Sequence, residues 1–514
     1  MSRRNKALVA VAFTYAQSVL GIVASLFITR LLVRSLGADL YGIWLATGGL
    51  LGYAGLADLG IFGVMPWLFA EADGAKDIAC KRSLIVHGLL AGVGAGVLYS
   101  IGASAIWLLL PHLAHLDAHS VAQLRGPIVV IVVATAVGYP VRLFPALRGG
   151  LQDFKFLGVL QLVGTLLNAS LSYGLLRAGL GLYAVVIASI TPTILTSVCS
   201  LIRTWRIDRP LLQELPRPTL RGTRPILTSG AGSWMGSLGW QMASATDVIV
   251  IAYLGYRELV PTFAITSRLG LTLMQFAWSL PDSGLIGLAN LGAEGNRSRT
   301  ESVVRTLIRL NLIPIGAVVC VTLAANATLV HFWVGSDLFG GELLNRILIL
   351  DVLVLTITHA LCTPAAVLGS RVQVGVITLV NGVVHIVLAL ILGHWFSLSG
   401  VAIATALSAL GTSIPVGIHL LTAMTGITGT SVIGSLILPW LWRALPSVLV
   451  AGLAGWVSHS YLVPRGFVTT VIIVGAMTAF TVFVYLWSVR GMIKDLPFGP
   501  RITRLLSAVG LVSL

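Results

Sequence analysis

Apolar stretches of about 20 residues follow one another along the whole chain and are separated by short polar breaks. A helix that spans a bilayer needs roughly 20 apolar residues, because each residue adds about 1.5 Å to its length. The pattern therefore predicts an all-α integral membrane protein with about fourteen transmembrane helices. We expect them near residues 7–29, 41–66, 84–110, 127–147, 157–177, 181–203, 226–255, 260–286, 306–330, 347–368, 374–394, 399–421, 446–464 and 467–489.

The composition supports a membrane protein and excludes an ordinary soluble fold. Of the 514 residues, 56% are hydrophobic and 10% are charged, with a mean hydropathy of +0.95, whereas soluble domains carry roughly 25% charged residues. The net charge of +15 does not indicate a nucleic-acid partner, since the basic residues lie at predicted helix ends and not on a soluble face. The first apolar run is longer than the core of a signal peptide, so we expect a retained helix.

Basic residues indicate the orientation in the membrane. With the N-terminus inside, most of the 33 lysines and arginines fall on cytoplasmic segments, and the positive-inside rule then places both termini in the cytoplasm. A proline-broken loop between the sixth and seventh predicted helices carries the densest basic cluster and is the natural hinge between two halves. This cluster consists of Arg203, Arg206, Arg209, Arg217, Arg221 and Arg224.

A weak internal repeat relates the two halves at an offset of about 218 to 219 residues. The aligned pairs are Leu36-Gly37 with Leu254-Gly255, Pro145-Ala146 with Pro364-Ala365, and Gly181-Leu182 with Gly400-Val401. Because six helices per repeat is an even number, both repeats enter the membrane from the same side and are related by an axis along the membrane normal. Two such lobes are expected to enclose a central cavity and to expose it alternately to each side.

The predicted organisation has four parts. The N-lobe spans residues 1–205, a basic proline-rich cytoplasmic linker spans 206–225, and the C-lobe spans 226–425. Residues 426–514 add a last helix pair and a basic cytoplasmic tail. Such a tail is expected to bind membrane lipids of the cytoplasmic leaflet or partner enzymes.

Several short segments resemble a known family. They are Phe27-Ile28-Thr29-Arg30, the run Leu36-Gly37-Ala38-Asp39-Leu40-Tyr41-Gly42-Ile43-Trp44, Asp58-Leu59-Gly60, Leu147-Arg148-Gly149-Gly150-Leu151-Gln152 and Asp247-Val248-Ile249-Val250-Ile251-Ala252-Tyr253-Leu254-Gly255. In these motifs, and in the helix pattern of residues 1 to about 490, the chain resembles the Wzx-type polysaccharide flippases of the multidrug/oligosaccharidyl-lipid/polysaccharide exporter superfamily.

The resemblance implies a function in polysaccharide biosynthesis. It implies a flippase in the bacterial inner membrane that moves an undecaprenyl-diphosphate-linked oligosaccharide from the cytoplasmic to the periplasmic leaflet. Polysaccharide polymerase and glycosyltransferases are the partner enzymes expected from such a role. Other members of the superfamily move lipid-linked peptidoglycan precursor or expel organic cations, so the residues themselves have to distinguish these activities.

Charged side chains inside a bilayer are costly, which makes each one a functional candidate. Helical rise places Asp247 and Arg268 about 10 Å from the far side, and Asp58 and Arg142 about 20 to 25 Å from it. We therefore expect one ion pair in each lobe. These pairs either fix helix packing, or their carboxylates bind a coupling H⁺ or Na⁺ while the arginines bind the diphosphate of the substrate.

Further candidates lie on the first and seventh predicted helices. Arg30 and Arg34 lie at the far-side end of the first helix, where they either meet the departing diphosphate or anchor the helix by reaching lipid phosphates. Sugar rings are expected to stack on aromatic side chains and to bond amides, although core packing accounts for the tryptophans equally well. The candidates for sugar contact are Tyr15, Gln17, Trp234, Trp240 and Gln241.

Two rival functions fit the sequence less well. A multidrug antiporter needs an acidic cavity for organic cations, whereas arginines match or outnumber acids at each predicted intramembrane site. A membrane glycosyltransferase or ligase needs placed acid, base or metal groups, but the loops are short and the sequence has no Walker A, HExxH or DxD motif. The four cysteines are scattered without a CxxC pair. We therefore expect a transporter and not an enzyme, with no resident cofactor or metal.

Overall fold

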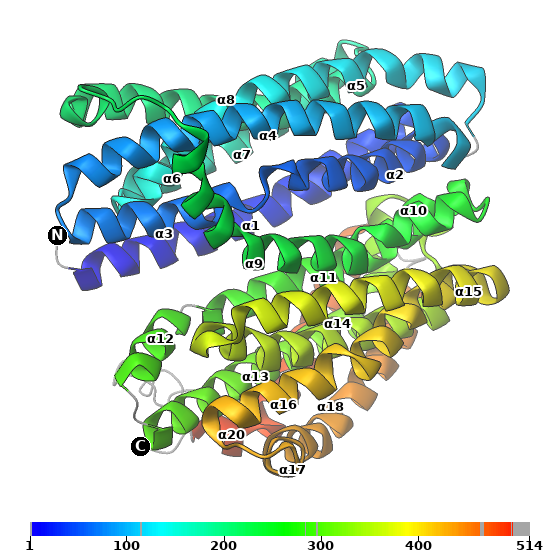
Figure 1. The fold of residues 1–514 in the computed structure, drawn as a ribbon. Coiled ribbons are helices and arrows are strands. Elements are labelled where there is room, and N and C mark those ends of the chain that lie inside the picture. The colour runs from blue at the N-terminus through cyan, green and yellow to red at the C-terminus, as the bar shows by residue number, and fades with distance from the viewer. Residues whose placement is uncertain are drawn as a thin grey trace. The chain divides into compact units, whose positions relative to one another are not determined.

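The computed structural model describes residues 3–113, 116–282, 284–294, 297–462, 467–494 and 496. Every regular element in these residues is a helix, which confirms the all-α prediction. Contacts between residues divide the chain into two compact units, Met1–Val260 and Pro261–Leu514. Figure 1 labels the helices of both units.

The first unit contains ten α-helices and four short helical turns among its described residues. Its α-helices are α1 (Arg3–Leu36), α2 (Ala38–Gly55), α3 (Ile61–Gly74), α4 (Ile78–Leu113), α5 (Ala118–Gly138), α6 (Leu143–Gly150), α7 (Phe154–Arg177), α8 (Leu182–Ile207), α9 (Leu220–Ser244) and α10 (Thr246–Tyr253). The turns are η1 (Leu56–Asp58), η2 (Pro140–Arg142), η3 (Arg209–Leu212) and η4 (Arg257–Leu259).

The second unit continues with α11 to α20. Its α-helices are α11 (Val260–Asp282), α12 (Leu285–Glu294), α13 (Arg297–Trp333), α14 (Gly341–Ala365), α15 (Arg371–Gly411), α16 (Ser413–Thr425), α17 (Gly429–Val432), α18 (Leu438–Val457), α19 (Phe467–Ser488) and α20 (Arg490–Lys494). Four short elements, η5 (Ser336–Leu338), η6 (Ala366–Ser370), η7 (Ile433–Ile437) and η8 (Ser458–Leu462), connect or extend them. The backbone of Ser397 leaves the helical region inside α15, so this long element consists of two helices.

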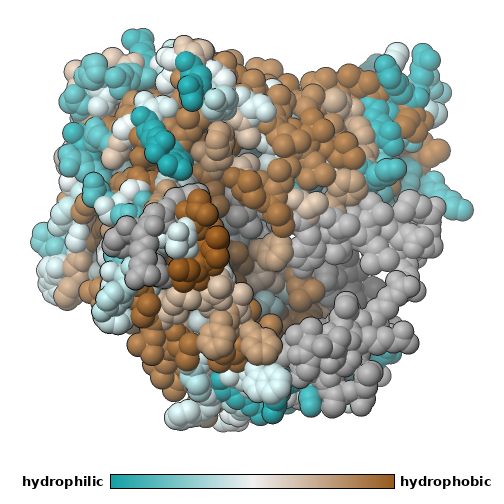
Figure 2. Space-filling model, turned by 180° about the vertical axis from the view of Figure 1, so that it is seen from behind, coloured by the Kyte–Doolittle hydropathy of each residue, from teal (hydrophilic) through white to brown (hydrophobic). Residues whose placement is uncertain are grey.

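The fourteen predicted spans all overlap helices of the structure. Ten segments of the described chain are long and apolar enough to cross a membrane, and one of them, Gly341–Thr425, covers several consecutive helices. Figure 2 shows hydrophobic side chains over much of the visible face and hydrophilic ones gathered toward its edges. Exposed apolar side chains such as Leu108 and Val137, 72% and 73% accessible, suit contact with lipid and not with water.

The boundary between the contact units differs from the predicted lobe boundary. The linker at 206–225 was expected to separate the lobes, whereas α9 and α10 pack against α2, α3 and α4 and belong to the first contact unit. The assignment of 226–425 to one lobe stays a prediction. The lobes were inferred from the internal repeat, whereas the two units are defined by contacts between residues.

Helices predicted as continuous spans are interrupted in the first unit. The second predicted span consists of α2 and α3 with η1 between them, and the fourth consists of α5 and α6 with η2 between them. At the first interruption Leu59 and Gly60 both have positive φ, 50° and 76°. A lipid bilayer offers no hydrogen bonds to free backbone groups, so the groups released at such breaks need partners inside the protein.

Neighbouring side chains supply those partners at the first break. The indole N–H of Trp234 on α9 donates to the carbonyl oxygen of Leu56 at 2.8 Å. The hydroxyl of Tyr139 donates to the carbonyl oxygen of Gly55, also at 2.8 Å. A backbone break is thereby tolerated inside the membrane-spanning part of the unit.

The break also brings two helices unusually close together. A Cβ atom at Gly230 on α9 would lie 2.6 Å from the carbonyl oxygen of Leu59, and a Cβ at Gly60 would collide with the carbonyl oxygen of Gly230. Near the other end of this contact the Tyr53 hydroxyl is bonded to that of Thr246 on α10. The contact therefore depends on glycine at two facing positions.

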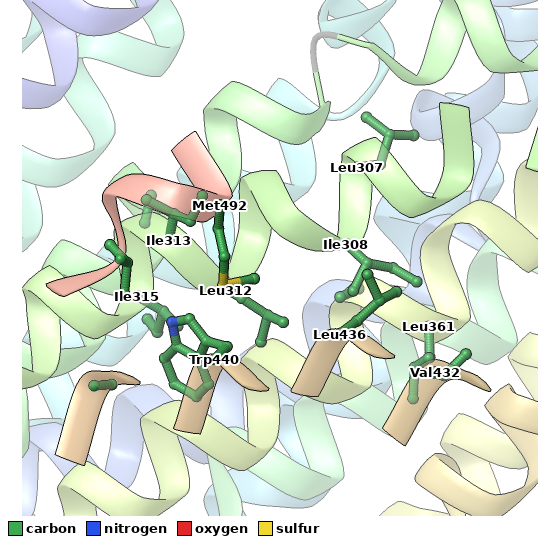
Figure 3. Packing of buried hydrophobic residues seen from close by; sticks show 14 of the residues in the cluster. Leu307, Ile308, Leu312, Ile313, Ile315, Leu361, Val432, Leu436, Trp440 and Met492 are labelled. Atoms are coloured by element: carbon green, nitrogen blue, oxygen red, sulfur yellow. The ribbon is translucent and has the colours of Figure 1, made fainter. Parts of the chain in front are cut away.

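The core of the second unit forms around α13. Apolar residues of α13 pack against α14, α17, η7, α18 and α20, and Figure 3 shows these side chains converging on Leu312 and Ile308. Trp440 of α18 donates its indole N–H to the hydroxyl of Tyr485 on α19 at 2.9 Å. That hydroxyl donates in turn to the carbonyl oxygen of Ile313 at 2.8 Å. The two helices of the last pair are thus bonded to each other, and α19 is bonded to α13.

A charge network ties α6, α7 and α8 together at the end of the first unit that is predicted to be cytoplasmic. The side chain of Arg148 is 3% accessible and forms ion pairs with Asp208 and, at 3.8 Å, with Asp153. Arg203 adds a second pair with Asp153. These residues line part of a cavity of about 500 Å³. Because Arg148 is buried, the two carboxylates are needed to compensate its positive charge.

The substitution Gly60→Ala tests the close approach of α3 and α9. We expect it to destabilise the protein by roughly 2 kcal/mol or more, because alanine is strained at positive φ and its Cβ would collide with Gly230. The melting temperature of purified protein in detergent measures the effect. Gly48→Ala on α2 is the control, since nothing lies within 4 Å of a Cβ there, and equal melting temperatures for both variants would contradict the expectation.

The substitution Arg148→Ala tests the buried charge network. It leaves Asp153 and Asp208 without their buried partner, so we expect a loss of about 3 kcal/mol. The same thermal measurement applies, with Arg206→Ala on the exposed side of α8 as the control, expected to change stability by less than about 0.5 kcal/mol. A stable Arg148→Ala protein would show that the network does not hold the three helices together.

Candidate functional site

The two helix breaks of the first unit place polar side chains within its membrane-spanning part. Asp58 is the last residue of η1, and one of its carboxylate oxygens accepts a hydrogen bond from the backbone N–H of Gly60 at 3.0 Å. Arg142 is the last residue of η2. Both turns pack against α4, so the two breaks lie next to the same helix. Both side chains are half-buried.

Tyr139 contacts both breaks. The guanidinium of Arg142 lies 4.9 Å from the centre of the Tyr139 ring, within range of a cation–π interaction. The ring is fully buried and packs against Tyr99, with 5.5 Å between the ring centres. Its hydroxyl is bonded to Gly55 next to η1. The tyrosine therefore connects the break that carries Arg142 with the break that carries Asp58.

Asp58 and Arg142 interact without forming a direct ion pair. Arg142 exerts an electrostatic attraction on the Asp58 carboxylate. Among the ion pairs of the described residues, none within 4.0 Å joins the two side chains. The guanidinium thus keeps hydrogen-bonding capacity for another anion, because an arginine has five N–H donors.

A cavity of about 150 Å³ lies beside Arg142 between α5 and α8. Arg142 is the charged residue among those that line it, and four hydroxyl side chains add hydrogen-bonding groups. These hydroxyls belong to Thr135, Ser189, Thr193 and Ser197. The site therefore combines one cation with neutral donors and acceptors, an arrangement that suits a phosphate group better than an organic cation.

Two of the predicted sugar-contacting side chains donate hydrogen bonds to backbone carbonyl groups of the first unit. Trp234 is bonded to Leu56, and the amide of Gln241 donates to the carbonyl oxygen of Gly49 at 3.2 Å. Trp240 is 37% accessible, and Gln17 on α1 is half-buried. The contact of these residues with sugar stays a prediction.

The other predicted residues lie on separate helices. Tyr15 belongs to α1, but its side chain lies outside the described part of the structure. Arg30 is half-buried and Arg34 is exposed, one turn apart on the same helix. Asp247 lies on α10 of the first unit, whereas the exposed Arg268 lies on α11 of the second. The expected pairing of Asp247 with Arg268 stays a prediction.

Sequence reasoning missed a polar cluster in the second unit. His359 on α14 is bonded to Asp282 at the end of α11 and stacks on Trp278. Asp282 and also Asp351 lie within predicted spans, so the rule that flags charges in membrane helices identifies both. His359 gave no such signal, because a histidine is neutral for much of the physiological range.

Comparison of the sequence gives no relative. No family model matches the chain, and no curated protein matches it.

Comparison of the structure does give neighbours. The chain resembles an outward-facing multidrug resistance MATE family transporter of the MOP superfamily, with a TM-score of 0.61 and 16% identity over 81% of this chain and 96% of that one. An inward-facing conformation of a MATE transporter matches with a TM-score of 0.60 and 16% identity over 82% and 99%. A MOP superfamily transporter from Pyrococcus furiosus, whose binding pocket has reverse polarity, matches at 0.58 and 17% over 81% and 96%.

All three of these neighbours are described as transporters. They also agree with the fold expected from the resemblance at the superfamily level. Because the identities are low, the likeness concerns the fold, and the Wzx-type assignment stays a prediction. The chain has the helical fold of the MATE transporters of the MOP superfamily over most of its length.

Proposed function

We propose that the protein is a flippase that moves an undecaprenyl-diphosphate-linked oligosaccharide from the cytoplasmic to the periplasmic leaflet. It works by alternating access in the bacterial inner membrane, with both termini in the cytoplasm. Polysaccharide polymerase and glycosyltransferases are the enzymes that would consume and supply its substrate. An H⁺ or Na⁺ gradient is the proposed energy source.

The observation that carries this proposal is the environment of Arg142. A guanidinium lies in the membrane-spanning part of the first unit beside a cavity lined by hydroxyl groups. The nearby carboxylate of Asp58 does not form a direct ion pair with it and is bonded to the backbone of Gly60. Arginine binds phosphate oxygens through two parallel hydrogen bonds, so the site favours a substrate with a phosphate or diphosphate group.

The alternative within the same fold is an antiporter of organic cations. Two of the structural neighbours are multidrug resistance transporters, whereas the Pyrococcus furiosus transporter has a pocket of reverse polarity, which suggests a different function for that protein. Pocket polarity therefore differs between transporters of this fold. A cavity whose charged lining residue is Arg142 would repel an organic cation.

Depletion of the protein combined with the variant Arg142→Ala tests the proposal. We expect depleted cells to accumulate lipid-linked oligosaccharide in the inner leaflet and wild-type protein to clear it. Arg142→Ala should clear it about tenfold more slowly or worse, because charge-assisted bonds to the diphosphate are lost. The leaflet distribution of the lipid-linked sugar, measured with a labelled lectin, gives the result.

Two variants serve as controls for this experiment. Arg142→Lys keeps the charge but loses the forked geometry, so we expect intermediate clearance. Arg206→Ala on the exposed side of α8 should clear the sugar like wild type. If depletion causes no accumulation and instead makes cells sensitive to organic cations, the antiporter replaces the flippase as the function.

A further inference from the structure

The second unit holds a histidine whose two ring nitrogens are both hydrogen-bonded. On α14, Nε2 of His359 lies 2.9 Å from a carboxylate oxygen of Asp282 at the end of α11. Its Nδ1 lies 3.1 Å from the hydroxyl of Thr363, one turn further along α14. The histidine side chain is 18% accessible and the aspartate 41%. The carboxylate therefore faces an exposed surface, while the imidazole is mostly enclosed.

An aromatic ring covers one face of the imidazole. The rings of His359 and Trp278 are parallel within 2°, with 4.2 Å between their centres. Trp278 is itself held in place, because its indole N–H donates to the hydroxyl of Thr356 at 3.1 Å and that hydroxyl donates to the carbonyl oxygen of Val352 at 2.8 Å. The indole face attracts a cation placed over it.

We propose that His359, held by Asp282, Thr363 and Trp278, is a proton-binding site. Histidine is the side chain that ordinarily changes charge between pH 5 and 8. A carboxylate in contact and an aromatic face both stabilise the imidazolium. The use of this proton for coupling rests on the proposed transport function, whereas the binding of the proton does not.

The hydrogen bonds permit both protonation states without a change of rotamer. In the neutral ring, Nε2–H donates to Asp282 and Nδ1 accepts from the hydroxyl of Thr363. After protonation, Nδ1–H donates to the same hydroxyl, whose hydrogen turns toward another acceptor. The site can therefore gain and lose a proton while each ring nitrogen keeps a partner.

Other titratable groups lie on the helices packed around α14. On the half of these helices near His359 they are Arg297, Arg299, Glu301, Arg305 and Arg309 on α13, Arg371 at the start of α15, His419 on α16 and Cys362 on α14. Arg305 is paired with Glu301, and the Cys362 thiol is directed at the carbonyl oxygen of Ser413. Within the described residues, Asp282 is the titratable group bonded to His359.

The location suits exchange of protons with one side of the membrane. His359 lies six residues before the end of α14 at Ala365, or about 9 Å from that end along the axis. By the predicted orientation this end faces the cytoplasm. When His359 is protonated, it forms a charged pair with Asp282 that links α14 to α11. Loss of the proton weakens this link.

The proton site is tested with the purified full-length protein in detergent, titrated from pH 5 to 8.5 while tryptophan fluorescence is recorded. An imidazolium stacked on an indole quenches its emission, so wild type should show a sigmoidal quench as the pH falls. Trp278→Phe removes the reporter and should remove this step. His359→Gln removes the titrating group and should remove it as well.

Two further variants distinguish proton binding from a general effect of pH. Asp282→Asn keeps the shape and hydrogen bonding but removes the negative charge beside the imidazole, so the midpoint of the quench should move to lower pH. His394→Gln removes an exposed histidine of α15 and should leave the step unchanged. A step that persists in His359→Gln, or an Asp282→Asn midpoint equal to that of wild type, would overturn the proposal.

This experiment does not depend on the identity of the substrate. If the quench follows the pattern above but cells show no accumulation of lipid-linked sugar, the proton site stands and the flippase proposal fails. If the sugar accumulates and the quench is independent of His359, the flippase stands and the proton site fails.

Discussion

The need to satisfy backbone hydrogen bonds without water determines much of this structure. In lipid, an interrupted helix exposes carbonyl and amide groups that water cannot reach. The first unit meets this requirement with side chains from neighbouring helices. Trp234 and Tyr139 donate to the carbonyls before and within η1, and Asp58 accepts from the amide that follows it. The same residues that complete the backbone thereby fix the position of the intramembrane charges.

The two helix breaks also explain how a polar site can form inside the membrane-spanning part of the first unit. A regular helix presents side chains outward at fixed angles, whereas Asp58 and Arg142 lie at the ends of η1 and η2, the two breaks that Tyr139 connects. Changes at Trp234 would alter the site through the backbone, because its indole N–H is bonded to the carbonyl oxygen of Leu56.

The sequence predicted the fold well because its main signal, apolar length, is a local property. All fourteen spans overlap helices, although α4 and α13 extend beyond the predicted ends, since their N-terminal turns carry charged residues such as Lys81 and Arg82 in α4 and Arg297 and Glu301 in α13. The breaks were not predicted, because residues such as Leu59 with positive φ carry no distinct sequence signal. Nor did the sequence indicate that α9 and α10 pack against α2 and α3, which is a long-range contact.

The candidate site was predictable only in part. The rule that charges in membrane helices are rare singled out Asp58 and Arg142, and helical rise assigned them similar depths. It did not reveal Tyr139, because a tyrosine in an apolar run resembles ordinary core. His359 was missed for a related reason, since its significance comes from Asp282 on another helix, 77 residues away in sequence.

The contact between the last helix pair and α13 bears on how a fold of this kind gains or loses helices. Gly316 leaves room for the ring of Tyr485, and any side chain at this position would collide with it. A twelve-helix chain without this pair would expose a notch in α13 to lipid tails. Such a chain would be expected to carry a larger apolar residue in place of the glycine, so the residue at this position records whether the additional pair is present.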